Sequence, residues 1–270
     1  MSKIDKLFNS LRKEGKTALI PFVIGGDPDL ATTRQIILEL ERKGADLIEV
    51  GVPFSDPLAD GPTIQKASLR ALAQNVSLSD IISLAATLKD EIKIPLVLMT
   101  YCNPIYKYGL DNFVNDAVSA GISGVAVPDL TPEEAHSLKK HADSRGLDMI
   151  FFLAPTSTEE RIKMITRGSK GFIYYVSLTG TTGARKQLSS TLAPSIKKIR
   201  EYTNKPIAVG FGISTPDQAN EVASYADGVI VGSAIVEIIE KNLNSKHIVK
   251  TVGEFCSSLK AALEGNPLPG

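Results

Sequence analysis

The chain has 270 residues, of which 43% are hydrophobic and 22% charged, and its 30 basic residues balance its 30 acidic ones. This composition is typical of a globular protein with a sizeable core, and the absence of a basic excess argues against nucleic-acid binding. No apolar run reaches the roughly 18 residues needed to span a bilayer, and Cys102 and Cys256 are too few for a disulfide framework or a metal motif, so we expect a cytoplasmic protein.

The first predicted element is an amphipathic helix over residues 1–16. After it, short apolar runs alternate with longer amphipathic segments, a pattern typical of parallel βα units. Most of the short runs are nearly continuous in Val, Ile, Leu and Phe, as expected of strands that are buried on both faces. We predict eight strands, over residues 18–24, 46–52, 95–101, 124–128, 148–153, 171–177, 206–211 and 228–231.

Helical patterns fill the intervals between these strands. Residues 32–43 and 110–120 repeat apolar side chains at helical spacing, and Thr131 and Thr215 each precede a proline, as expected at a helix N-terminus. No linker rich in Gly, Ser or Pro divides the chain, so we predict one domain over residues 1–270. The alternation favours a single (β/α)8 TIM barrel with an extra N-terminal helix, and an open doubly wound sheet is the alternative.

Two carboxylates stand near the end of the second predicted strand and in the loop after it, and in such barrels the active site lies at the C-terminal ends of the strands. Glu49 stands inside an apolar run, where burial would raise its pKa towards neutrality and suit it to acid–base catalysis. A rim position, or an ion pair with a distant cation, is the alternative for Glu49. Asp60 closes the next loop, where its alternative role is a turn or helix cap before Gly61 and Pro62.

Glycines at the later strand ends indicate a phosphate site. Residues 178–185 form a Gly/Thr-rich loop with the composition of a mobile lid. Gly212 follows the seventh strand, and Gly232 and Ser233 follow the eighth, where they would open a helix whose N-terminus attracts an anion. Apolar side chains at strand ends could hold a flat ring beside the phosphate, although each alone is more often core: Phe22, Met99, Tyr101, Phe152, Tyr174 and Phe211.

Residues 47–61, with the proline that follows, carry the pattern hydrophobic-Glu-hydrophobic-Gly-x-Pro-Phe-Ser-Asp-Pro-x-Ala-Asp-Gly-Pro. This long pattern resembles the signature of tryptophan synthase α subunits. Residues 99–104, 181–183, 210–213 and 232–234 extend the resemblance, which runs from about residue 21 to residue 236.

The resemblance implies a lyase of tryptophan biosynthesis that cleaves indole-3-glycerol phosphate into indole and glyceraldehyde 3-phosphate by a retro-aldol reaction. Glu49 would be the catalytic acid/base, and Asp60 would accept or stabilise the indole N–H. The active-site tyrosine maps to Tyr174, with Tyr175 as the neighbouring alternative. Thr182 would pair with Asp60 when the lid closes.

The family's substrate-binding residues also map onto this chain, at Phe22, Tyr101, Thr182, Gly183, Phe211, Gly212, Gly232 and Ser233. Asp129 resembles a loop residue that supports the site. No cofactor or metal is expected, because carboxyl groups serve both proton transfers and the pyridoxal phosphate of the pathway belongs to the β subunit. That subunit is the expected partner, in an αββα heterotetramer. We expect its contact on an exposed apolar rim of Pro53, Phe54 and Pro57, together with Pro104, Ile105 and Tyr106 in a loop over residues 103–106 after the third strand.

Two other functions fit parts of the pattern. One is another phosphate-binding barrel lyase or isomerase, although a Schiff-base aldolase would need a lysine at a strand end, and Lys66, Lys93 and Lys107 are predicted in loops or helices. The other is a catalytically silent barrel that only activates a β-subunit partner. The presence of Glu49 and Asp60 together with the phosphate glycines argues against silence.

Overall fold

The structure of the protein, a computed structural model, describes residues 1–176, 185–210 and 212–264. Its strands form one sheet in which every pair of neighbours is parallel, in the order β5-β4-β3-β2-β1-β9-β8-β7-β6. The strands are β1 (Ala18–Ile24), β2 (Ile48–Gly51), β3 (Leu96–Met99), β4 (Ile122–Ala126), β5 (Asp148–Ile150), β6 (Phe152–Leu153), β7 (Ile173–Val176), β8 (Ile207–Gly210) and β9 (Gly228–Val231).

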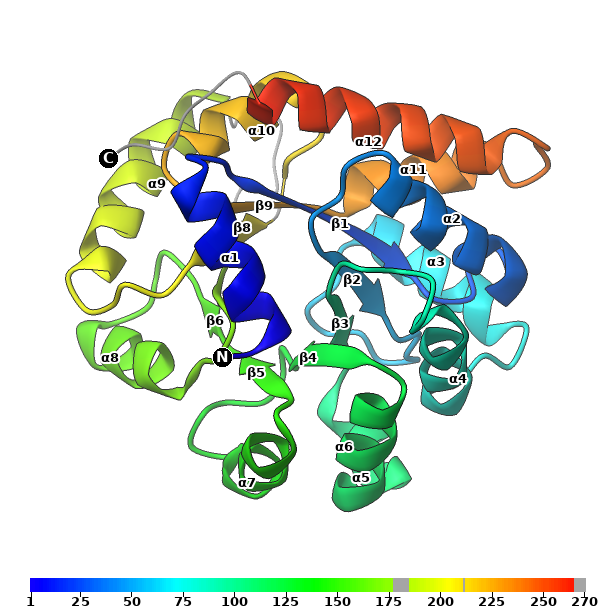
Figure 1. Cartoon of the computed structure of the whole chain (residues 1–270), viewed down its shortest axis with the longest axis horizontal. Coiled ribbons are helices and arrows are strands. Elements are labelled where there is room, and N and C mark those ends of the chain that lie inside the picture. Colours follow the sequence, from blue (N-terminus) through cyan, green and yellow to red (C-terminus); the bar gives the residue numbers. More distant parts are fainter. Residues whose placement is uncertain (177–184, 211, 265–270) are drawn as a thin grey trace.

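The two strands at the ends of this order are consecutive in the chain, with only Phe151 between β5 and β6. The Phe151 carbonyl accepts a hydrogen bond from the backbone N–H of Tyr174, 3.1 Å away, so the backbone stays paired across the interruption. The two short strands are therefore halves of one barrel strand, and the sheet curls into a nearly closed ring (Figure 1). The predicted eight-unit barrel is confirmed, and the open-sheet alternative is wrong.

Helices surround the strands, and the predicted extra N-terminal helix lies across one end of the barrel (Figure 1). No helix within the described ranges is long and apolar enough to cross a membrane. The helices are α1 (Lys3–Lys13), α2 (Leu30–Arg42), α3 (Pro62–Leu72), α4 (Leu78–Leu88), α5 (Cys102–Tyr108), α6 (Leu110–Ser119), α7 (His136–Arg145), α8 (Glu159–Gly168), α9 (Arg185–Arg200), α10 (Pro216–Ala223), α11 (Ser233–Lys241) and α12 (Ile248–Glu264).

Of the two predicted helix starts, only one begins a helix directly. The Thr215 side chain caps α10 and forms a capping box with Gln218. The turn at Thr131 closes with a bond from the N–H of Ala135 to the Thr131 carbonyl, 2.9 Å, but α7 begins only at His136. The prediction of a helix start at Thr131 is therefore wrong by one turn.

The barrel interior holds its own apolar cluster, which is separate from the larger core between strands and helices. Helix α1 closes one end of it: a Cβ atom at Gly124 or Gly171 would lie 3.1 Å from Ile4, and one at Gly228 would lie 3.5 Å from Phe8. These glycines belong to the N-terminal side of the barrel, so α1 covers that end and leaves the C-terminal end to the loops. The cluster comprises Ile4, Phe8, Leu11, Ala18, Ile20, Leu47, Val97, Ala126, Ile150, Phe172, Tyr174, Ala208 and Ile230.

Candidate active site

Glu49 lies inside the barrel near the C-terminal end of β2, where Phe22 of β1 is its partner in the strand register. Its exposed fraction is 1%. Its Oε2 atom accepts a hydrogen bond from the Tyr174 hydroxyl at 3.4 Å, and Oε1 has no hydrogen-bond partner among the described residues. The rim and ion-pair alternatives for Glu49 do not hold, because the carboxyl is buried beside a tyrosine and forms no ion pair with any residue that the structure describes.

Burial raises the pKa of Glu49 to about 8. The hydrogen bond from Tyr174 opposes this shift, and the negative charge of Asp60 adds to it. The pKa of the Tyr174 hydroxyl is also raised well above its ordinary value, by burial and then by the charge of Glu49. Glu49 is therefore a carboxyl group that holds a proton near neutral pH and can exchange it with a bound molecule.

Asp60 reaches the same end of the barrel from the loop between β2 and α3. Its N–H bonds to the Pro57 carbonyl at 3.0 Å, and its own carbonyl accepts from the Gln65 side chain at 2.8 Å. Burial raises the pKa of Asp60 to about 6, against the opposing effect of a hydrogen bond with Tyr101. The N-cap of α3 is Gly61, without a side-chain cap, so Asp60 is not a helix cap.

The two neighbouring tyrosines of β7 point in opposite directions. Tyr174 belongs to the interior cluster, and its ring lies 4.7 Å from that of Phe152. A Cβ atom at Gly210 would lie only 2.8 Å from the Tyr174 ring, so a glycine there gives the ring its space. Tyr175 is buried in the larger core between strands and helices. Only Tyr174 shares the barrel interior with Glu49.

Tyr101 anchors the loop that carries Asp60. Its hydroxyl accepts a hydrogen bond from the N–H of Ala59 at 3.1 Å, and its ring stacks on Phe54 with 5.2 Å between centroids. Sequence reasoning treated Tyr101 only as a pocket wall and did not find this anchoring contact, because nothing in the local sequence links it to residue 59. Cys102, the residue after Tyr101, donates its backbone N–H to the Asp129 carboxylate at 2.9 Å. Asp129 therefore supports the N-terminus of α5.

Phe22 lies between β2, which carries Glu49, and Gly232, at the end of β9 where we expect the phosphate. A Cβ atom at Gly51 would come within 2.6 Å of its ring, and one at Gly232 within 3.2 Å. Helix α11 begins at Ser233, as the sequence predicted, and Ser233 and Gly212 are both exposed. Gly232, the N-cap of α11, provides no side-chain cap, and the N-terminus of a helix suits an anion. Thr182, Gly183 and Phe211 lie outside the described residues, as does the predicted lid except for Arg185, which begins α9.

The apolar rim differs from the prediction in two ways. Residues 103–106 form part of helix α5 and are not a loop. Pro104 is compatible with this helix because it stands in the first turn, where a backbone N–H would have no helical partner. Pro53 and Ile105 are buried, so they offer no surface. Tyr106 is 58% exposed, and Leu58, which the prediction left out, is 90% exposed.

Two carboxyl groups of raised pKa at the loop end of a barrel are typical of an enzyme that carries out acid–base chemistry. Comparison with known proteins makes the class specific, since the model of the tryptophan synthase alpha chain family matches residues 8–264. The chain belongs to this family. Its enzymes are lyases of tryptophan biosynthesis that cleave indole-3-glycerol phosphate and work with a β subunit. The family resemblance in the sequence is confirmed, and neither alternative function is favoured.

Individual relatives match over nearly their whole length. The tryptophan synthase alpha chain of Geotalea uraniireducens (strain Rf4) is 52% identical over 98% of each chain. That of Microcystis aeruginosa is 50% identical over 98% of this chain and 100% of the relative. The crystal structure of tryptophan synthase subunit alpha from Legionella pneumophila str. Paris superposes with a TM-score of 0.92 at 36% identity, covering 98% of this chain and all of that one.

Proposed function

We propose that Glu49 and Asp60 carry the proton transfers by which the chain cleaves indole-3-glycerol phosphate into indole and glyceraldehyde 3-phosphate. The observation that supports this most strongly is the pair of raised pKa values, about 8 for Glu49 and about 6 for Asp60. Between these values Glu49 is protonated while Asp60 is ionised. A proton donor and a negative charge are thus available together near neutral pH, as the reaction requires.

The cleavage begins with transfer of the Glu49 proton to carbon C3 of the indole ring. The ring becomes a cation at its N–H, which the Asp60 carboxylate stabilises. Glu49, now ionised, takes the proton of the hydroxyl on the carbon attached to C3. The bond between the two carbons breaks, its electron pair returns to the ring, and an aldehyde leaves. The same carboxyl has then given and regained one proton, so the enzyme is restored.

Tyr174 takes a supporting part in this proposal. Its hydroxyl donates to Glu49 at 3.4 Å and keeps its own proton because of its raised pKa, so it orients the carboxyl without competing as a base. Phe22 and Tyr101 would form walls for the indole ring. Gly212, Gly232 and Ser233 would bind the phosphate through backbone N–H groups. For Thr182, Gly183 and Phe211, substrate binding rests on the family pattern alone.

Release of indole from indole-3-glycerol phosphate by the pure chain tests this function directly. The variant Glu49→Gln keeps the shape of the side chain but has no proton to transfer, so we expect kcat to fall by at least about 10²-fold. Glu160→Gln, an exposed change on α8, is the matched control and should leave kcat unchanged. A folded Glu49→Gln protein that retains most of its activity would contradict the role of Glu49. An inactive wild type would favour the silent activator.

We also propose an assembly, a cellular location and a domain structure for the protein. An αββα heterotetramer would place the β subunit on the catalytic rim, where Leu58 and Tyr106 are exposed. Cys102 and Cys256 are both free thiols, as expected in a reducing cytoplasm. The single sheet takes strands from both the first and the last part of the chain, which supports one domain over residues 1–270.

A further inference from the structure

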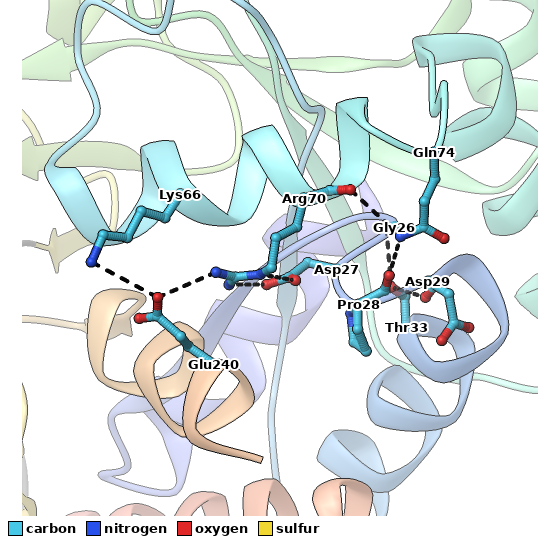
Figure 2. A network of polar contacts seen from close by, with 9 residues as sticks. All are labelled: Gly26, Asp27, Pro28, Asp29, Thr33, Lys66, Arg70, Gln74 and Glu240. Atoms are coloured by element: carbon cyan, nitrogen blue, oxygen red, sulfur yellow. Dashed lines mark hydrogen bonds and ion pairs between the residues drawn. The ribbon is translucent and has the colours of Figure 1, made fainter. Parts of the chain in front are cut away.

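A group of charged side chains joins three elements beside the barrel (Figure 2). Arg70 of α3 binds Asp27 with two N–H groups, Nε to Oδ1 at 2.7 Å and NH2 to Oδ2 at 2.8 Å. Its NH1 group lies 3.4 Å from Oε1 of Glu240 on α11, and Lys66 lies 3.9 Å from the same oxygen. The Asp27 side chain is fully buried and that of Arg70 is 22% exposed, so this is an interior contact.

The segment that holds Asp27 is itself fixed on both sides. The N–H of Gly26 bonds to the Thr33 hydroxyl at 3.0 Å, and that hydroxyl bonds to the Asp29 carbonyl at 2.8 Å. Gly26 has a φ of +87°, and a Cβ atom there would lie 2.8 Å from a Val76 methyl group, so only glycine fits. Asp27 therefore offers its carboxylate from a rigid base after β1 (Figure 2).

The two helices that meet at Arg70 begin at the two halves of the candidate site. Helix α3 starts at Pro62, two residues after Asp60, and the Gln65 side chain donates a hydrogen bond to the Asp60 carbonyl. Helix α11 starts at Ser233, at the expected phosphate end. The two helices pack against each other and against β1. A change in their relative placement would therefore alter the distance between the carboxylate and phosphate ends of the site.

We propose that Arg70 is a positioning residue, whose contacts with Asp27 and Glu240 hold α3 and α11 at the spacing that a substrate with both an indole ring and a phosphate requires. This inference rests on the proposed function, since it assumes that Asp60 and Ser233 act on opposite ends of one substrate. The planar guanidinium sets both the distance and the orientation of its partners through parallel hydrogen bonds. Lysine keeps the charge but, as a point charge, cannot form this fork.

Binding of three probes by calorimetry tests the inference: indole, glycerol 3-phosphate, and indole-3-propanol phosphate, which joins the two ends. In catalysis a misplacement of about 1 Å can cost up to about 10²-fold in rate, and a probe that must reach both ends of the site at once depends on their spacing in the same way. We expect Arg70→Lys to weaken the binding of indole-3-propanol phosphate at least about tenfold. The affinities for indole and for glycerol 3-phosphate, which each occupy one end of the site, should stay within about twofold of wild type. Glu240→Gln, which keeps the Asp27 pair, should act in the same direction with a smaller factor.

The control is Arg42→Lys, which alters another arginine–glutamate pair, with Glu39, at the C-terminal end of α2 and thus at the opposite end of the barrel from the catalytic loops; it should change none of the three affinities. The inference is overturned if Arg70→Lys and Glu240→Gln weaken all three probes equally, or none of them. Should Arg70→Lys fail to fold, Glu240→Gln alone decides between these outcomes. The proposed function fails separately, if wild type neither binds indole-3-propanol phosphate nor releases indole from its substrate.

Discussion

The variant Glu49→Gln should be more stable than the wild type as well as inactive. The pKa of Glu49 rises from 4.5 to about 8 on folding, chiefly through burial. Between these values the unfolded chain releases the proton and the folded protein keeps it, so each pH unit lowers the unfolding free energy by about 1.4 kcal/mol. Relative to its value below pH 4.5, the unfolding free energy of the wild type is thus lower by about 3 kcal/mol at pH 7 and by about 5 kcal/mol above pH 8. Glutamine does not titrate and escapes this loss.

Urea unfolding of both proteins from pH 5 to pH 9 measures this difference. The advantage of Glu49→Gln should grow steadily up to about pH 8 and then stay level, since above its folded pKa the glutamate is ionised in both states. Any constant offset from the amide itself does not affect this slope. Glu160→Gln, the exposed control, should run parallel to wild type. Parallel curves for Glu49→Gln as well would refute the assignment of a buried, protonated carboxyl.

Four further outcomes follow from the geometry of the site. Because burial raises the pKa of Asp60 to about 6, kcat/KM of the wild type should fall as the pH drops below that value, and Asp60→Asn should lose this limb of the pH–rate profile together with most of the rate. The change Gly210→Ala puts a Cβ atom 2.8 Å from the Tyr174 ring, so it should lower kcat and cost about 1–3 kcal/mol of unfolding free energy, both of which can be measured on one preparation. In Ser233→Asp a carboxylate occupies the first turn of α11, where it stabilises the helix but repels the phosphate, so KM should rise at least about tenfold while Tm does not fall. An unchanged KM would show that the phosphate does not bind at this helix. With an added β subunit, Tyr106→Ala should reduce the acceleration of indole release and keep the basal rate, whereas a parallel fall in both would place this side chain in the active site.

The predicted elements agree with the structure where local sequence is sufficient. Strands β1 and β9 match their predicted bounds, because continuous apolar runs between polar segments leave little choice. Strand β4 begins two residues before its predicted start, since Gly121, with a φ of +87°, ends the preceding turn early. Helix α5 was missed because Pro104 usually interrupts a helix, yet in the first turn it costs no hydrogen bond.

The site was predictable only in part, for a similar reason. A glutamate inside an apolar strand is visible in the sequence, and so is a glycine that precedes a helix. The apolar run itself did not choose between Tyr174 and Tyr175, because successive residues of a strand face opposite sides and either could face the interior; only the family pattern favoured Tyr174. The register of β7 against β8, which pairs Tyr174 with Ala208, places Tyr174 in the interior.

The alternation of strand and helix, the carboxylates in and after the second strand and the family signature are properties of short segments, so the sequence alone determined the barrel, the family and the candidate acid and base. Closure of the barrel decided the rest. It buries Glu49 beside a tyrosine 125 positions away and thereby raises its pKa. It also brings Arg70 to Asp27 and Glu240, which are 43 and 170 positions distant. Contacts at such separations depend on how all the intervening elements pack, and no local pattern encodes them.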